Sequence, residues 1–183
     1  MKVLIVTSSP NKDGLTAACG EQARLGAVES GVEASVVSLN ELNVGKCQAC
    51  KNGWGSCLEK NICQINDDFQ NMHAALKDAG AVIIVTPVYW GDMSESAKAF
   101  LDRVRRCEGL KKENQFLKGK PVICVAAAGG TGNGIISCLG TMERFVDHVK
   151  GTKYDFIGVT RKNTAYKLET IYAAAKSMGC SLT

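Results

Sequence analysis

Four cysteines crowd one short stretch of the chain, between residues 46 and 66. They are Cys47, Cys50, Cys57 and Cys63, and their spacing is C-x2-C-x6-C-x5-C. Thiolates at such spacing are typical of sites that hold a soft metal or an iron–sulfur cluster. Three interpretations stay open, because spacing alone does not separate them: an iron–sulfur cluster, a structural zinc ion, and reduced or disulfide-forming thiols. We expect a cluster first, with these four cysteines as the metal ligands.

The remaining cysteines lie in segments whose pattern indicates a helix or a strand. We expect each to be a small buried apolar residue; they are Cys19, Cys107, Cys124, Cys138 and Cys180. The apolar run near the N-terminus is shorter than a secretion signal needs, so we expect a cytoplasmic protein whose thiols stay reduced.

The composition predicts a single globular domain. The chain has 183 residues, of which 45% are hydrophobic and 22% charged, and its formal net charge is +4. We therefore expect one domain over residues 1–183, with a cysteine-rich insertion at residues 46–66. The densest basic run, Arg103, Arg105 and Arg106, is more typical of a solvated helix face than of a nucleic-acid surface. We expect neither a nucleic-acid nor a membrane partner.

Short apolar runs alternate with amphipathic stretches along the chain. The runs lack period-two alternation, which predicts strands buried on both faces, at Val3–Val6, Ala34–Ser38, Ala81–Thr86, Val122–Ala126 and Phe156–Val159. Helical spacing is found at Leu15–Glu29, Phe69–Lys77, Glu95–Arg106, Ile135–Val149 and Tyr166–Met178. This alternation predicts an α/β fold, a flavodoxin-like three-layer sandwich with a five-stranded parallel sheet in the order 2-1-3-4-5. Its ligand crevice opens at the carboxyl ends of strands 1 and 3.

The segment after the first strand offers groups that suit an anion. Ser8, Ser9, Asn11 and Thr16 supply hydroxyl and amide groups, and Gly14 leads into a helix whose N-terminal N–H groups favour a phosphate. The segment contains no G-K-[ST] and no G-x-G-x-x-G, which disfavours a Walker-type or Rossmann nucleotide site. The alternative is an ordinary strand-to-helix turn.

Two further loops follow the third and fourth strands. After the third, Pro87, Tyr89, Trp90 and Gly91 offer aromatic faces and a close backbone approach that suit a flat ligand, although the aromatic rings can also pack the top of the sheet. After the fourth, the segment AAAGGTGNG is nearly bare of side chains, as in a tight turn or a wall for a planar ring. Together the three loops predict a ligand with a phosphate tail and a flat head.

The segments SSPNKDGLT, TPVYWGDMSESAKAFLDR and AAAGGTGNG resemble the NADPH-dependent FMN reductase and flavodoxin-like oxidoreductase family. The cysteine-rich insertion followed by NDDF resembles the iron–sulfur flavoprotein branch. The resemblance implies that the FMN phosphate is held by Ser9, Asn11, Leu15 and Thr16, and that the isoalloxazine lies between two walls. One wall is Pro87, Val88, Tyr89, Trp90 and Gly91, and the other is Gly129, Gly130 and Thr131. The candidate set is completed from the same loops by Ser8, Gly14, Thr86, Ala128 and Gly132.

The chain departs from the family pattern in two places. Ser8 and Asn11 stand where relatives often have a glycine and an arginine. Two consequences stay open: phosphate binding is looser, or Lys12 supplies the positive charge. The cysteine spacing is wider than the family's usual C-x2-C-x2-C, and the longer gap contains Gly53 and Gly55, which let the backbone loop back.

The resemblance implies an FMN-dependent NAD(P)H oxidoreductase. Electrons would pass from a reduced nucleotide or carrier through FMN to a small quinone-like acceptor, to an electron carrier, or to a 4Fe-4S cluster at the cysteines. FMN carries the chemistry, so no catalytic acid or base is expected, and His73 and His148 are expected to be ordinary surface or packing residues. The family also implies a homodimer or homotetramer. The alternative functions are a flavodoxin-like electron carrier and a redox-sensing interaction module.

Overall fold

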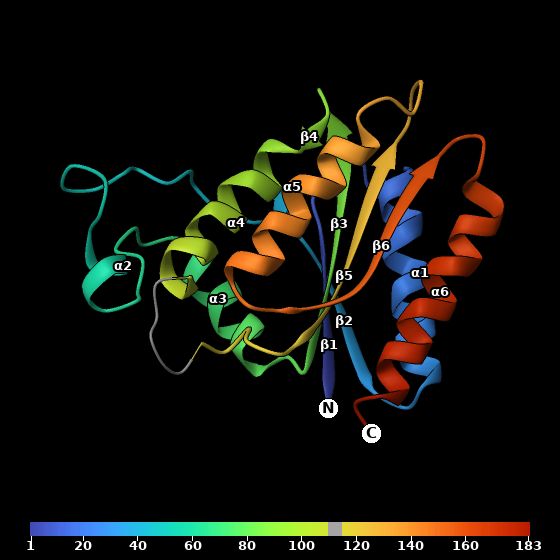
Figure 1. The fold of residues 1–183 in the computed structure, drawn as a ribbon, viewed down its shortest axis with the longest axis horizontal. Helices are drawn as coiled ribbons and strands as arrows, with labels where there is room; N and C mark the ends of the chain where they lie inside the picture. The colour runs from blue at the N-terminus through green and yellow to red at the C-terminus, as the bar shows by residue number, and fades with distance from the viewer. Residues whose placement is uncertain (110–114) are drawn as a thin grey trace.

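The computed structural model describes residues 1–109 and 115–183, which form one sheet with helices on both faces (Figure 1). The parallel strands are β1 (Lys2–Thr7), β2 (Glu33–Ser38), β3 (Ala81–Tyr89), β5 (Pro121–Ala128) and β6 (Thr152–Thr160). Their order is β2-β1-β3-β5-β6, so the predicted order is confirmed. A two-residue strand, β4 (Asp92–Met93), pairs antiparallel with the end of β3 and was not expected from the sequence.

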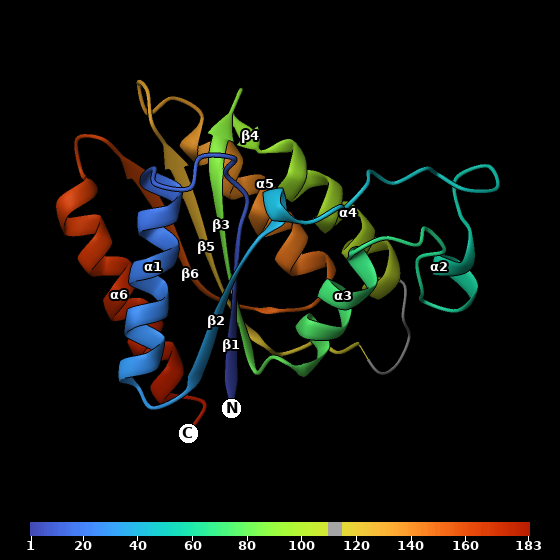
Figure 2. The ribbon, with the colours of Figure 1, turned by 180° about the vertical axis from the view of Figure 1, so that it is seen from behind.

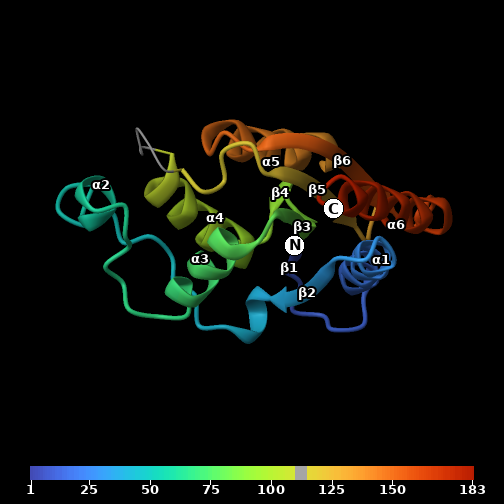
Figure 3. The same cartoon turned by 90° about the horizontal axis from the view of Figure 1, so that it is seen from below.

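The helices divide between the two faces of the sheet, as Figures 2 and 3 show. One face is covered by α1 (Leu15–Glu29) and α6 (Thr164–Cys180), the other by α3 (Phe69–Asp78), α4 (Glu95–Glu108) and α5 (Ile135–His148). Successive residues of β1 point to opposite faces, so Val3 and Ile5 join one apolar core while Leu4 and Val6 join the other. The expected three-layer sandwich is confirmed.

One expectation about the strands is wrong. The segment Ala34–Ser38 was expected to be buried on both faces, but β2 is an edge strand and none of its residues is buried. Its apolar run resembles that of a central strand. The expectation failed because residue types alone do not report a strand's position in the sheet.

The cysteine-rich insertion joins the edge of the sheet to α3. The short helix η1 (Leu39–Glu41) follows β2, and the insertion itself contains one helical turn, α2 (Ser56–Glu59). In Figures 1 and 2 the loop around α2 projects from the body beside α4. Within the described parts of the chain, no helix is both long and apolar enough to cross a membrane.

Candidate functional site

Three loops that are distant in the sequence meet at the carboxyl edge of the sheet, at the ends of β1, β3 and β5 (Figure 1). Serine hydroxyls join the first loop to the second. Ser94 Oγ donates to the backbone oxygen of Ser8 at 2.9 Å, and Ser94 N donates to Thr86 Oγ1 at 3.0 Å. Ser8 Oγ donates to the backbone oxygen of Val85 at 3.4 Å. Because Ser8 and Thr86 are buried in this network, their side chains position the two loops relative to each other.

The first loop presents polar groups beside the start of α1. Ser9, Asn11 and Thr16 line one cavity. Gly14 caps α1 without a side-chain hydrogen bond, and the first turn carries no acidic residue, so the positive end of the helix dipole is not countered there. The three side chains that were expected to hold a phosphate therefore lie together at a helix start that suits an anion.

Lys12 lies at the same cavity. Its Nζ pairs with Glu41 Oε1 at 2.6 Å, and this hydrogen bond raises the pKa of the Lys12 ammonium. Both side chains are largely exposed, so the pair is open to exchange with another anion. The cation expected in place of the family's arginine is thus present next to Asn11.

The second loop is a β-hairpin whose turn consists of Trp90 and Gly91. Both have positive φ, 51° and 79°, which is the geometry of a type I′ turn. Left-handed backbone is costly for a tryptophan, and the Trp90 side chain is fully exposed, while Tyr89 is 38% exposed. Neither ring packs the sheet's interior. A strained, solvent-facing aromatic residue beside a candidate ligand site is the arrangement expected of a ring-binding surface.

The third loop brings bare backbone next to the hairpin. A Cβ atom on Gly134 would lie 2.5 Å from the Gly91 Cα atom, so the two loops touch at a point where only glycine fits. Ser137 Oγ donates to the backbone oxygen of Gly91 at 2.6 Å and fixes the contact. Gly129 and Gly130 are exposed, and a Cβ atom on either would meet nothing within 4 Å.

The remaining candidate residues lie in these same loops. They are Leu15 at the start of α1, Pro87 and Val88 near the end of β3, Ala128 at the end of β5, and Thr131 and Gly132 in the third loop. The arrangement fits FMN in two respects: the first loop has the donors for a phosphate, and Gly129 and Gly130 leave open backbone where a planar ring can lie.

The four cysteines of the insertion line a single cavity. Its wall also includes Arg103, Arg106 and Cys107, all from α4. Within residues 1–109 and 115–183, no three His, Cys, Asp or Glu side chains are arranged around one metal ion. In a four-iron cluster each thiolate binds a different iron, so its cysteines surround a wider space than those of a single-ion site. Four cysteine thiols around one cavity are a donor set that fits such a cluster.

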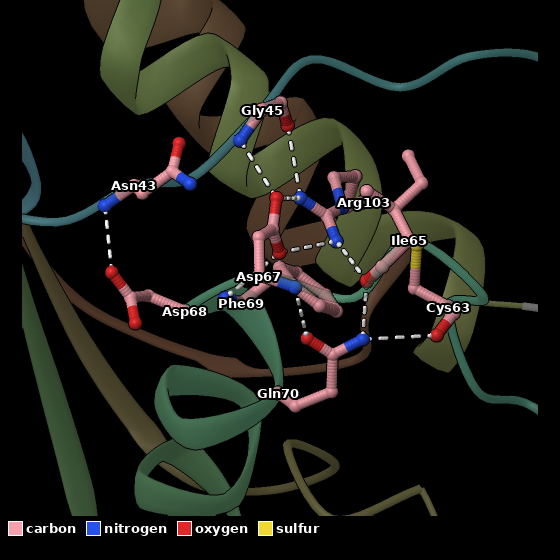
Figure 4. A network of polar contacts seen from close by, with 9 residues as sticks. All are labelled: Asn43, Gly45, Cys63, Ile65, Asp67, Asp68, Phe69, Gln70 and Arg103. Atoms are coloured by element: carbon pink, nitrogen blue, oxygen red, sulfur yellow. Dashed lines mark hydrogen bonds and ion pairs between the residues drawn. The ribbon is translucent and has the colours of Figure 1, made fainter.

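Arg103 holds the base of the insertion (Figure 4). Its guanidinium donates to both carboxylate oxygens of Asp67, at 2.6 and 2.9 Å, and to the backbone oxygens of Gly45 and Ile65, at 2.9 and 3.2 Å. Burial by itself would lower the pKa of Arg103, but the hydrogen bonds with Asp67 and the nearness of the Cys63 side chain outweigh it and raise the pKa. The expectation that Arg103 lies on a solvated face is wrong, because its side chain is 1% exposed.

Arg106 holds the tip of the insertion. Its Nη1 donates to the backbone oxygen of Gly53 at 2.5 Å, and its guanidinium lies 4.4 Å from the centre of the Trp54 ring. Cys107, the next residue, is fully buried. Sequence reasoning missed this contribution of α4; the only signal was the i, i+3, i+4 spacing of Arg103, Arg106 and Cys107, which places them on one helix face.

The two histidines lie away from the three loops. His73 stacks on Phe69 with ring centres 5.2 Å apart, and its Nε2 lies 3.1 Å from Glu108 Oε1. His148 ends α5, where burial and the nearby Arg105 lower its pKa. The packing or surface role expected for each agrees with these positions.

The comparisons with known proteins agree on one family. A family model described as NADPH-dependent FMN reductase matches residues 1–153. An iron–sulfur flavoprotein of Methanosarcina thermophila is 31% identical over 138 residues, which cover 73% of this chain and 66% of that protein. One of Archaeoglobus fulgidus is 29% identical over 124 residues, covering 68% and 60%. One of Methanocaldococcus jannaschii is 31% identical over 105 residues, covering 57% and 52%. The chain thus spans about half to two thirds of the length of these relatives.

Solved structures share the fold. An NAD(P)H:quinone oxidoreductase from Methanothermobacter marburgensis has a TM-score of 0.71 at 18% identity, with 100% of this chain and 96% of that chain covered. A flavone reductase has a TM-score of 0.78 at 14% identity, with 100% and 63% covered. At such identities the likeness shows the fold alone.

Proposed function

We propose that this chain, which belongs to the NADPH-dependent FMN reductase family, is an FMN-dependent oxidoreductase that takes electrons from NAD(P)H and passes them to a small acceptor or to an iron–sulfur cluster. The resemblance to this family and to its iron–sulfur flavoproteins is confirmed. The observation that carries the proposal is the meeting of three loops at one sheet edge, which supply phosphate donors, an exposed aromatic residue and bare backbone.

We assign the FMN phosphate to the first loop. Ser9, Asn11 and Thr16 would donate to the phosphate oxygens, and the start of α1 would add its dipole. Gly129 and Gly130 would face one side of the ring, and the hairpin containing Trp90 would face another. Bound FMN supplies hydride acceptance and electron transfer, so the chain's own residues have only to bind the ring, orient it and leave one side open.

The exposed hairpin supports a reducing nucleotide as the donor. Trp90 lies at the rim of the candidate flavin site, where an aromatic ring can stack on a nicotinamide. The chain carries neither a Rossmann nor a Walker motif, so we propose that NAD(P)H binds transiently against the open side of the flavin. The acceptor would be a small quinone-like molecule or an electron carrier.

We assign an iron–sulfur cluster, a 4Fe-4S centre, to Cys47, Cys50, Cys57 and Cys63. The four thiols share one cavity, and arginine side chains hold both the base and the tip of the loop that carries them. The helix α4 starts at the flavin loops and ends at this cavity, so at 1.5 Å per residue the span from Ser94 to Arg106 is about 18 Å. Such a separation favours a cluster that meets a flavin at a contact between subunits, in a homodimer or homotetramer.

The visible spectrum of anaerobically purified protein tests both cofactors. A brown protein that releases FMN and contains about equal amounts of iron and sulfide would support the proposal. A yellow protein without iron would leave the flavin assignment and remove the cluster. One zinc per chain without sulfide would replace the cluster by a structural metal. A colourless protein that takes up no FMN would overturn the proposal.

Rapid mixing with NADPH or NADH tests the enzyme. Bleaching of the flavin absorbance by either nucleotide, faster with one than with the other, is expected. A flavin that is reduced by light but not by a nucleotide would indicate an electron carrier of the flavodoxin kind. That alternative is less favoured, because carriers are usually acidic and this chain has a net charge of +4.

A further inference from the structure

One face of α4 forms a wall of the cysteine cavity. Arg103, Arg106 and Cys107 follow one another at i, i+3 and i+4, and all three line the cavity with the four cysteines of the insertion. Two of the three carry a positive charge at any physiological pH. The cavity is thus bordered by thiols from one segment and by guanidinium groups from another, some forty residues further along the chain.

Arg103 has one donor without an acceptor. Its Nη1 and Nη2 donate to Asp67 and to the backbone oxygens of Gly45 and Ile65. Its Nε is buried and has no hydrogen-bond partner among the residues that the structure describes. A buried N–H group without an acceptor costs free energy, and such groups are rare in native proteins. This one belongs to a side chain in the wall of a cavity lined by thiol sulfurs, and sulfur atoms accept hydrogen bonds.

Arg106 places a second charge at the cavity without an acidic partner in the contacts described for it. Its guanidinium is held by a backbone oxygen and by the Trp54 ring. The neighbouring Arg105 points elsewhere: its Nε lies 3.7 Å from Asp102 Oδ1, and it lines the groove between α4 and α5 instead of the cysteine cavity. The two adjacent arginines therefore provide a test position and a matched control.

We propose that Arg103 and Arg106 raise the reduction potential of the cluster at Cys47, Cys50, Cys57 and Cys63. Arg103 acts through an Nε–H bond to a sulfur of the centre, and Arg106 acts through its charge. Four thiolates give the centre a net negative charge, and reduction adds one electron, so nearby cations stabilise the reduced form more than the oxidised form. Both arginines are positioning residues, because they line the cavity of the proposed metal ligands and act on the centre instead of the substrate. This inference rests on the proposed cluster.

The test compares variants of the cluster-loaded full chain by a redox titration followed by electron paramagnetic resonance. Arg106→Gln removes one charge and should lower the midpoint potential by about 59 mV, equivalent to a tenfold change in the one-electron equilibrium. Arg106→Lys keeps the charge and should restore at least half of that difference. Arg105→Gln removes the same charge from the next position and should leave the potential unchanged.

A second variant tests the hydrogen bond. Arg103→Lys keeps the charge but removes Nε–H, and it should lower the potential while the bound FMN, which reports on the fold, stays at the wild-type level. If Arg106→Gln and Arg105→Gln have the same potential, or if Arg103→Lys leaves it unchanged, the inference is overturned. A wild-type chain that binds no iron would overturn the cluster itself, and the wild-type iron content therefore separates that failure from a failure of the arginine effect.

Discussion

The carboxylate of Asp67 and the guanidinium of Arg103 form a two-point ion pair, with Oδ2 and Oδ1 at 2.6 and 2.9 Å from the two terminal nitrogens. Both side chains are buried, 6% and 1% exposed. Burial by itself would raise the pKa of the Asp67 carboxyl, but hydrogen bonds from Arg103 and from the backbone of Gly45 and Phe69 lower it. The pair thus fixes both ends of the cysteine loop to α4, since Gly45 precedes the loop and Asp67 follows it.

Removal of Asp67 should therefore loosen the loop and weaken the fold. Asp67→Ala leaves the Arg103 charge buried without its partner, and we expect the free energy of unfolding to fall by about 3–5 kcal/mol. Denaturation by urea under reducing conditions measures this loss. We also expect the variant to retain less iron than the wild type after reconstitution, because the base of the loop is no longer held.

The adjacent residue gives the control for this prediction. Asp68 accepts a hydrogen bond from the exposed backbone N–H of Asn43 at 2.7 Å, so Asp68→Ala should cost only about 1 kcal/mol. Equal losses of stability in the two variants would show that the buried ion pair does not hold the loop.

The strands could be predicted from the sequence because central parallel strands consist of continuous apolar residues, and five of them alternating with helices are typical of the flavodoxin-like order. The three ligand loops follow from that order, since each begins where such a run ends. Ser9, Asn11 and Gly129 could accordingly be chosen without the structure. The exposure of the edge strand β2 could not be predicted, because the residues of a strand do not show which strands lie beside it in the sheet.

The α4 wall of the cysteine cavity could not be predicted in the same way. Arginine is almost never fully buried, so the ordinary rule assigns Arg103 to solvent. Its burial depends on Asp67, and no local pattern connects two residues that are 36 positions apart. The hairpin at Trp90 was also missed, since a bulky aromatic residue is disfavoured at a position with positive φ.

The cysteines should differ sharply in reactivity. Burial raises the pKa of the Cys19 and Cys138 thiols to about 12, and it raises the pKa of Cys124 as well. At pH 8 a thiol with such a pKa is ionised in roughly one molecule in ten thousand, so alkylation with iodoacetamide should be very slow. The expectation that Cys180 is buried is wrong: it lies exposed at the end of α6 and should react in the native protein. Mass spectrometry of the alkylated peptides measures the difference.

Metal loading should protect the four cysteines of the insertion from alkylation in the same labelling experiment. The four cysteines of the insertion are partly exposed and should be alkylated after a chelator removes the metal, but not while the metal is bound. Cys180 provides the internal control, because its labelling should be equal in both samples. Equal labelling of the insertion cysteines in both samples would contradict their assignment as ligands.

Gly134 should be essential to the contact between the hairpin and the glycine loop. Gly134→Ala places a Cβ atom 2.5 Å from the Gly91 Cα atom at a residue with φ of 84°, and we expect a loss of stability of about 1–3 kcal/mol together with weaker FMN binding. Gly119→Ala is the control: its φ is 76°, and a Cβ atom there meets nothing within 4 Å. Gly119 lies just before β5, at the amino ends of the strands and away from the three loops, so Gly119→Ala should lower stability without weakening FMN binding. Fluorescence quenching on FMN titration measures the affinity.

Gly129 should show the reverse behaviour, with binding lost and stability kept. The space around its absent side chain is open, so Gly129→Val strains no neighbour in the folded protein. The new side chain would occupy the place proposed for the flavin ring, and we expect at least a tenfold weaker affinity for FMN, about 1.4 kcal/mol. Gly140→Ala, in the middle of α5, should stabilise the chain by about 1 kcal/mol and leave FMN binding unchanged. Tight FMN binding by Gly129→Val would move the ring away from this loop.

Trp90 should be a residue whose replacement stabilises the fold while it weakens function. The residue holds a left-handed backbone conformation, φ 51°, that costs an L-residue about 1–2 kcal/mol, and its fully exposed ring gains no packing in return. Asparagine followed by glycine is a favoured pair for this type of turn, so Trp90→Asn should raise the free energy of unfolding by about 1 kcal/mol. It also removes the aromatic surface proposed to face the flavin and the nicotinamide. We therefore expect weaker FMN binding and slower bleaching by NAD(P)H in the more stable variant.

Trp90→Phe is the control, because it keeps an aromatic ring and should retain both FMN binding and flavin reduction. A stabilised Trp90→Asn variant with undiminished flavin reduction would show that the strain serves no ligand.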